Sequence, residues 1–292
     1  EDQAVANGCQ VFWAEDAAAA NRYIASLVHR DLAIKLRGLA QTSTGLPAGS
    51  QASRGGASST SHPSAPRHVC RIVKCRSAIA AEIGLDAALR QAGTAISAIA
   101  PPAPRQGVTA ALVEVAETQL GDYIVQLAAD QPSHSVYPAM HRRKEDVAAL
   151  FEEKLDMPQT LDIQGMASMA RYELRQKLLQ ADIGIGELAF AVAETGSLAL
   201  AGESGNERLL ACLPRTLVLL MGLEQVAATL EDLLLLLELR DRSATGQPLS
   251  PYVTLLNGPA RPGDPDGPEE VHLVILDNGR GALLQSPWRA AL

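Results

Sequence analysis

Short apolar runs typical of strands alternate with longer amphipathic stretches along most of the chain. Residues 9–14 and 68–73 are predicted strands, and predicted helices follow them over 15–31 and through about residue 91. The other predicted strands lie at 111–116, 189–193, 197–201, 216–221 and 271–276, and the other predicted helices at 141–155, 163–180 and 225–240. This alternation predicts an α/β fold with a mostly parallel open sheet and helices on both faces.

Two segments interrupt this pattern. Ser, Thr, Gly, Ala and Pro supply 21 of the 27 residues from Gln41 to Arg67, and such a composition buries too little apolar surface to offset the entropy cost of ordering. We therefore expect a flexible insertion at 41–67 and a second, Pro-rich insertion near 97–112. The rest of residues 1–292 is expected to form a single α/β domain.

Composition and charge exclude several classes of function. The 292 residues are 47% hydrophobic and 20% charged, which is typical of a globular protein. A net charge of −8 and an aromatic content of 3% argue against nucleic-acid binding. Asp232 and Glu238 bracket the five leucines between them, and no apolar run approaches the roughly 18 residues of a membrane span.

The four cysteines and six histidines predict no metal site. Cys70 and Cys75 are the only closely spaced cysteines, without the further ligands of a zinc or iron–sulfur motif. We expect reduced thiols in a cytoplasmic protein, and, since no Met or signal peptide opens the chain, a fragment of a longer one. Gly184 and Gly186 resemble part of a dinucleotide fingerprint but follow a helix, so we interpret them as a helix cap followed by a strand.

Charged and small polar residues follow several predicted strands. Lys74 and Ser77 follow one strand, the segment Glu194–Gly196 separates two others, and Asn206 and Arg208 follow a third. Open parallel sheets bind their ligands at the carboxyl ends of strands, so these residues are candidates for a ligand site.

Each candidate has a chemical role in this prediction. Lys74 and Arg208 are expected to hold an anionic group, and the hydroxyl groups of Ser77 and Thr195 are expected to form hydrogen bonds with its oxygens. Gly196 is expected to let the ligand approach the backbone. Glu194 follows an apolar run, where an unpaired carboxylate is costly, and is the candidate catalytic residue. The alternative is that these residues form solvated turns and helix caps.

A set of short motifs spans nearly the whole chain outside the two insertions. They are Ile72-Val-Lys-Cys-Arg-Ser77, Glu82-Ile-Gly-Leu85, Glu117-Thr-Gln-Leu-Gly-Asp122, Pro132-Ser-His134, Ala181-Asp-Ile-Gly-Ile185, Ala193-Glu-Thr-Gly-Ser197, Gly205-Asn-Glu-Arg208, Arg242-Ser-Ala-Thr-Gly-Gln247, Gly258-Pro259 and Leu276-Asp-Asn-Gly-Arg280. Together they resemble the LUD-domain family of lactate utilisation proteins, most closely the B-type, iron–sulfur subunit.

This resemblance implies a fold like the sugar isomerase, ribose-phosphate isomerase and CoA-transferase superfamily, and a role in a complex that oxidises L-lactate to pyruvate. It implies other subunits of that complex as partners, or a small organic acid as ligand. It also places 4Fe–4S clusters in a C-terminal region beyond Leu292, with no cofactor in this chain. Glu82, Ser243 and Thr245 join the expected ligand-binding residues through the same motifs.

The chain departs from the family pattern at two positions. Cys75-Arg76 stands where the family has a Ser-Lys pair, and Gln119 stands where an acidic residue is usual. Two other functions stay open. One is an acyl-CoA transferase-like or phosphosugar-type enzyme that uses Glu194, and the other is an inert scaffold.

Overall fold

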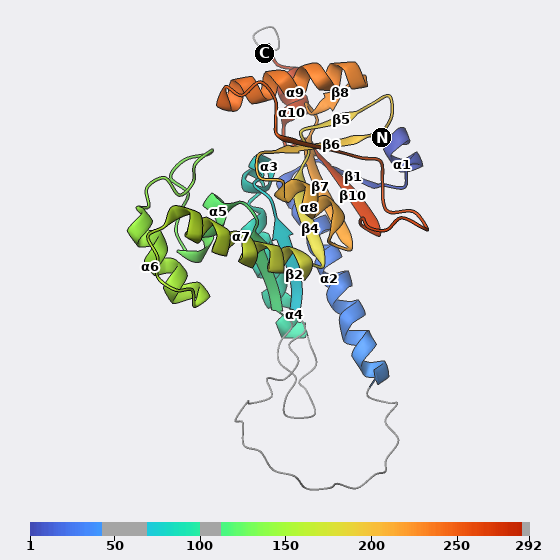
Figure 1. Cartoon of the computed structure of the whole chain (residues 1–292). Helices are drawn as coiled ribbons and strands as arrows, with labels where there is room; N and C mark the ends of the chain where they lie inside the picture. Colours follow the sequence, from blue (N-terminus) through green and yellow to red (C-terminus); the bar gives the residue numbers. More distant parts are fainter. Residues whose placement is uncertain (43–68, 100–111, 288–292) are drawn as a thin grey trace.

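The computed structural model describes residues 1–42, 69–99 and 112–287. The predictions for residues 43–67 and 100–111 therefore lie outside the described residues. The described residues form ten helices and ten strands (Figure 1). In chain order these are α1 (Asp2–Ala6), β1 (Gln10–Ala14), α2 (Ala17–Thr42), β2 (Val69–Lys74), α3 (Ala78–Glu82), α4 (Leu85–Ile99), β3 (Leu112–Glu117), α5 (Leu120–Leu127), α6 (Lys144–Leu155), α7 (Ile163–Leu179), β4 (Ile183–Glu187), β5 (Phe190–Val192), β6 (Leu198–Gly202), α8 (Asn206–Cys212), β7 (Thr216–Gly222), β8 (Val226–Ala227), α9 (Leu230–Thr245), β9 (Tyr252–Leu256), β10 (Glu270–Leu276) and α10 (Arg280–Leu284).

Six strands form a parallel sheet in the order β1-β10-β7-β4-β2-β3. Every neighbouring pair in this sheet is parallel, so the carboxyl ends of all six strands lie at the same edge. The central strand β7 is buried along its whole length, as expected for a sheet covered on both faces. The predicted α/β class with a mostly parallel sheet is confirmed.

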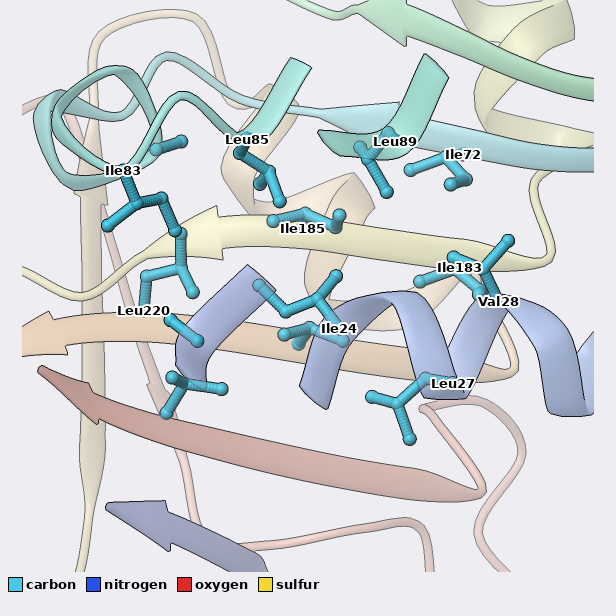
Figure 2. Close-up of a cluster of buried hydrophobic side chains, with 14 of the residues drawn as sticks. Ile24, Leu27, Val28, Ile72, Ile83, Leu85, Leu89, Ile183, Ile185 and Leu220 are labelled. Atoms are coloured by element: carbon cyan, nitrogen blue, oxygen red, sulfur yellow. The ribbon is translucent and has the colours of Figure 1, made fainter. Parts of the chain in front are cut away.

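One face of the sheet is covered by α2, α3 and α4. Ile24 and Val28 of α2 are fully buried and pack with Ile183 and Ile185 of β4 in one apolar cluster, to which α4 contributes Leu89 (Figure 2). The spacing of four residues between Ile24 and Val28 puts both side chains on the same side of the helix. Aliphatic side chains fill this interface, as the low aromatic content requires.

The opposite face packs against α7, α8 and a second sheet. Leu178 of α7, Leu210 of α8 and Leu200 of β6 belong to one buried cluster with the parallel strands. The second sheet has the strand order β8-β5-β6-β9. The apolar runs at 189–193 and 197–201, which the sequence alone allows as two strands or one bent strand, form the two strands β5 and β6, and these run antiparallel.

Helix α9 covers the second sheet and begins later than predicted. Leu233 and Leu237 of this helix are buried in a cluster with Val192 and Ala199. The helix predicted from residue 225 starts at Leu230, because the Thr229 side chain caps it by accepting a hydrogen bond from the Asp232 N–H. Among the described helices, none is long and apolar enough to cross a membrane.

Gly184 and Gly186 lie within strand β4, so their interpretation as a helix cap is wrong. A Cβ on Gly184 would lie 2.9 Å from Pro214 Cγ and 3.1 Å from Leu210 Cγ. These glycines allow α8 and the turn after it to pack directly on the sheet. Helix α7 ends at Leu179 with Gln180 as its C-cap residue, and β4 begins at Ile183.

Candidate functional site

Two adjoining clefts lie at the carboxyl ends of β2, β3 and β4. We call the first the glutamate cleft; it has a volume of about 700 Å³ and is lined by Glu187, Glu203 and Glu207 with residues of α5 and α9. The second, the lysine cleft, has a volume of about 860 Å³ and is lined by Lys74 and Glu117 with residues of α3 and α4. Both include Arg76, Ala78, Ser135 and Pro138 in their walls. This edge of the sheet is where parallel α/β folds bind ligands.

Lys74 lies at the end of β2 and is locked between two carboxylates. Its Nζ is 2.6 Å from Glu117 Oε1 and 3.3 Å from Asp86 Oδ1, and only 8% of its side chain is exposed. Burial alone would lower the pKa of Lys74, but the charges of Glu117 and Asp86 outweigh it and hold that pKa above its ordinary value. The Lys74 ammonium group therefore stays protonated, and the two carboxylates balance its charge. It can pair with an anionic ligand only if one of these carboxylates moves away.

Arg76 joins the sheet to the segment that forms the outer wall of both clefts. Its Nε donates to Asp122 Oδ2 at 2.9 Å, and another guanidinium nitrogen donates to the Val136 carbonyl at 2.8 Å. The planar guanidinium group can hold two partners at the same time. Arg76 thus fixes the position of the loop that contains Val136.

Ser77 caps helix α3 and connects it to strand β4. Its hydroxyl accepts a hydrogen bond from the Ala80 N–H at 2.9 Å and donates to Glu187 Oε2 at 2.7 Å. Glu187 also accepts from the Ile79 N–H at 3.1 Å. The Ser77 hydroxyl is therefore engaged within the protein.

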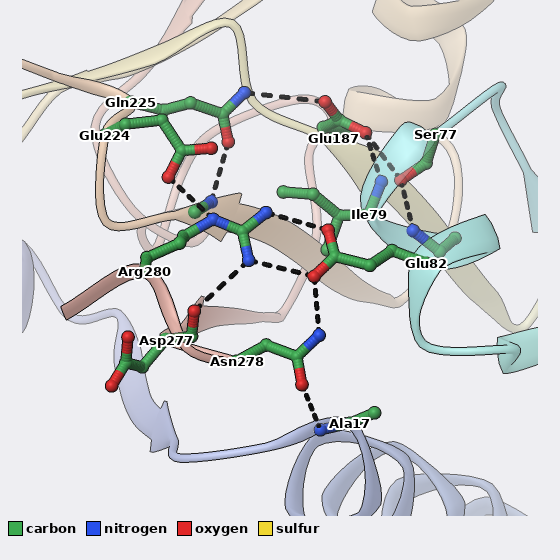
Figure 3. A network of polar contacts seen from close by, with 12 residues as sticks. Ala17, Ser77, Ile79, Glu82, Glu187, Glu224, Gln225, Asp277, Asn278 and Arg280 are labelled. Atoms are coloured by element: carbon green, nitrogen blue, oxygen red, sulfur yellow. Dashed lines mark hydrogen bonds and ion pairs between the residues drawn. The ribbon is translucent and has the colours of Figure 1, made fainter. Parts of the chain in front are cut away.

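A polar network around Arg280 lies beside this point (Figure 3). Arg280 contacts Glu82 at 2.8 Å and Glu224 at 2.8 Å, and Asn278 donates to Glu82 at 2.6 Å. The neighbouring Gln225 donates to the Leu188 carbonyl at 2.7 Å. Glu82, a predicted ligand residue, thus joins α3 to the start of α10, and it lines neither cleft.

Glu207 of α8 is the most deeply buried acid of the glutamate cleft, with 8% of the residue exposed. Its Oε1 accepts a hydrogen bond from Gln119 Nε2 at 2.6 Å. Its Oε2 has no hydrogen-bond partner among the described residues. The carboxylate occupies the space over Gly202 that a side chain there would fill.

The structure does not bring Glu194, Thr195 and Gly196 to the clefts. They form the turn between β5 and β6, where Glu194 is exposed, and the Thr195 carbonyl accepts a hydrogen bond from the Asn7 side chain at 2.9 Å. Gly196 has φ +69°, and a Cβ there would lie 2.5 Å from the Gln3 backbone. Close packing of α1 explains this glycine, whereas the ligand approach that we predicted does not. Catalysis by Glu194 stays a prediction.

The remaining predicted residues are also dispersed. Asn206 donates to the Thr118 carbonyl, Arg208 and Ser243 are exposed, and none of the three lines either cleft. Thr245 lines the glutamate cleft. Of the predicted ligand residues, the structure thus places Lys74 and Ser77 in one cleft and Thr245 in the other.

Sequence reasoning missed the residues that give the glutamate cleft its character. Glu207 lies inside the motif Gly205-Asn-Glu-Arg208, and Gln119 was noted only as a departure from the family pattern. The signal available was the position of Glu207 among the first residues after a strand. Its burial depends on Gly202 and Gln119, which are distant in the sequence.

One cluster of possible metal ligands occurs in the described part of the chain. Oxygen and sulfur atoms of Asp31, Cys70 and Asp182 lie within 4.8 Å of one another. Lys35 forms ion pairs with both aspartates, at 3.2 Å from Asp31. An internal ammonium group therefore already supplies the positive charge that these aspartates require.

A comparison with models of protein families shows to which family this chain belongs. The sequence profile of the LUD domain matches residues 1–276. This chain belongs to the LUD domain family. The resemblance expected from the motifs is thereby confirmed.

The curated relatives of this LUD domain are longer proteins. "Lactate utilization protein B" from Geobacillus sp. (strain WCH70) is 42% identical over 223 residues, covering 76% of this chain and 43% of that protein. The protein of the same name from Bacillus subtilis (strain 168) is 40% identical over 223 residues, with the same coverage. The chain thus spans less than half the length of these relatives.

A crystal structure of a DUF162 family protein from Deinococcus radiodurans is 21% identical and covers 35% of this chain and 57% of that chain, with a TM-score of 0.27. At that score the likeness supports no argument about the fold of this LUD domain. The parallel sheet described above rests on the structure itself.

The cysteines of this LUD domain do not fit an iron–sulfur cluster. Cys9, Cys70 and Cys75 are buried and Cys212 is half-buried, and no metal-ligand group of the described residues contains two of them. Burial raises the pKa of Cys9 to about 11 and raises the pKa values of the other three. An iron–sulfur cluster needs several thiolates close together. The described cysteines form no such group, and their raised pKa values disfavour the thiolate form.

Proposed function

We propose that this chain is the LUD domain of a lactate utilisation protein B and acts within a complex that oxidises L-lactate to pyruvate. The observation that carries the proposal is 42% identity over 223 residues to a protein of that name. The match covers 43% of that relative, so the steps that move electrons are assigned to other regions or subunits. In this proposal the iron–sulfur clusters belong to those regions, because the cysteines described here do not form a group of neighbouring ligands.

The role proposed for the domain itself is to bind another subunit of this cytoplasmic complex. The extent of the match supports it, because the matched region makes up 43% of that relative and the redox steps then need regions or subunits in contact with this domain. A small organic acid is the less favoured ligand, since Glu187, Glu203 and Glu207 line the glutamate cleft and like charges repel.

A domain exchange in Bacillus subtilis tests the proposal. The LUD domain of its lactate utilisation protein B is replaced by residues 1–276. The comparison strain lacks that protein and is first checked for loss of growth on L-lactate. Growth on L-lactate is expected to return. A chimera that accumulates to the native level but supports no growth contradicts the proposal.

The same strain tests the predicted catalytic role of Glu194. The Glu194→Gln chimera is expected to grow like its parent, because this side chain is exposed outside both clefts. Loss of growth at an unchanged melting temperature would favour Glu194 as a catalytic residue and the transferase-like alternative. The same variant shows whether the removal of an exposed carboxylate has by itself any effect on growth.

A further inference from the structure

The glutamate cleft combines a buried carboxylate, an excess of negative charge and an apolar wall. We propose that it binds a small organic cation, an alkylammonium compound whose ammonium group pairs with Glu207 and whose stem lies on the apolar wall. This inference concerns the cleft alone and does not depend on a role in lactate oxidation.

The first argument is the state of the Glu207 carboxylate. It is 8% exposed, and among the described residues its one hydrogen-bond donor is the neutral amide of Gln119. Oε2 has no hydrogen-bond partner in the described part of the protein. A buried carboxylate without a cation carries a large desolvation cost, which a ligand ammonium entering the cleft would offset.

The second argument is the charge balance of the cleft. Its two arginines already have acidic partners: Arg76 pairs with Asp122 at 2.8 Å and Arg240 with Asp241 at 3.4 Å. No ion pair involves Glu187, Glu203 or Glu207 within the described ranges. The hydrogen bonds to Glu187 come from Ser77, a backbone N–H and Gln225, and neutral donors leave its charge uncancelled. The cleft therefore attracts cations and repels anions.

The third argument is the apolar part of the lining. Leu120, Val136, Leu188 and Leu200 border the same cleft. A volume of about 700 Å³ lies within the range of about 300–1,000 Å³ that accommodates small organic ligands. An inorganic cation would leave this wall without a partner, whereas an alkyl stem would cover it.

The backbone beside Glu207 prepares the carboxylate for such a partner. Gly202 has no side chain, and the carboxylate takes the place that a Cβ would occupy. Gln119 holds the other carboxylate oxygen. The acceptor is thus fixed before a ligand arrives, which reduces the entropy lost on binding.

Three probes with the same six-carbon stem and different head groups test the inference on the full chain. They are hexylammonium, 1-hexanol and hexanoate, titrated against protein with isotope-labelled leucine and valine methyl groups. Hexylammonium is expected to bind at least tenfold more tightly than hexanol, with shifts at Leu188 and Leu200, and hexanoate is expected not to bind. Equal or tighter binding of hexanoate overturns the inference, and this comparison needs no variant.

Two matched variants then locate the ammonium group. Glu207→Gln is expected to weaken hexylammonium binding at least tenfold and to leave hexanol binding unchanged. Glu203→Gln, which removes an exposed carboxylate of the same cleft, is expected to weaken it less than threefold. Unchanged affinity in a folded Glu207→Gln protein, or equal losses in both variants, overturns the assignment to Glu207. Failure here leaves the growth test of the domain exchange unaffected, so the two proposals fail separately.

Discussion

Removing the ammonium group of Lys74 should destabilise this LUD domain severely. In the variant Lys74→Met an unbranched apolar side chain replaces lysine at a similar length. Glu117, whose side chain is only 11% exposed, would then lose the ammonium group that now lies 2.6 Å from it. Burial already holds the pKa of Glu117 above its ordinary value, so without Lys74 this carboxyl group either stays charged at a high cost or takes up a proton. Its Oε2 already has no hydrogen-bond partner among described groups, so little is available to replace Lys74.

The expected magnitude follows from burial. Breaking a buried ion pair by removing one partner costs about 3–5 kcal/mol, because the other charge stays buried and uncompensated. The second partner, Asp86, has a side chain that is 46% exposed, and pairs with exposed groups contribute about 0–1 kcal/mol. The loss should therefore come almost entirely from Glu117.

The same two strands offer a matched control. Arg71 of β2 faces Glu114 of β3 in the same register as Lys74 faces Glu117, but these side chains are 44% and 63% exposed. Arg71→Met should therefore cost no more than about 1 kcal/mol. The free energy of unfolding is measured for both variants by urea denaturation at neutral pH.

A double variant separates charge from packing. Lys74→Met with Glu117→Leu replaces the pair by two apolar side chains and should recover most of the loss, because the uncompensated charge is gone. The reasoning is refuted if Lys74→Met costs no more than Arg71→Met, or if the double variant is less stable than Lys74→Met alone.

Two further predictions concern the thiols and the Arg280 network. At mildly alkaline pH a thiol reagent should label Cys212 first, since Cys9, Cys70 and Cys75 are buried; mass spectrometry identifies the sites, and equally fast labelling of Cys75 would show that the cleft opens. Hydrogen bonds from Arg280 hold the pKa of Glu82 below its ordinary value of 4.5, so this pair stabilises the folded state above that pH and loses its effect as pH falls through the lowered pKa. The stability difference between the protein and Arg280→Gln should thus be constant near neutral pH and shrink below pH 4.5, and a difference that grows on acidification would contradict this.

The strands of the parallel sheet could be predicted from the sequence because each is a run of buried apolar residues. β7 and β10 are the clearest cases, since they are covered on both faces. Strand β9 was missed because it lies at the edge of the second sheet and most of its residues are exposed. Helix α8 spans only seven residues, too few to show a helical period.

The site was predicted only in part, because strand ends are local features and their partners are not. Lys74 was correctly placed at the end of a strand, but its pairing with Glu117 follows from the register of β2 and β3. The prediction for Glu194 assumed that the break between two apolar runs faces the ligand edge of the parallel sheet. The break is instead the turn of an antiparallel pair in the second sheet, against the N-terminal helix.

The pairing of the first strand with the last affects how this LUD domain folds during synthesis. β1 is made before every other described strand, but its one neighbour among the described strands of the parallel sheet is β10, which is made after all the others. Until then β1 and α1 have no native partner strand, and contacts between such distant segments form slowly. The nascent chain must therefore carry β1 without its partner while the residues between the two strands are made, and an unpaired strand edge is prone to mispairing.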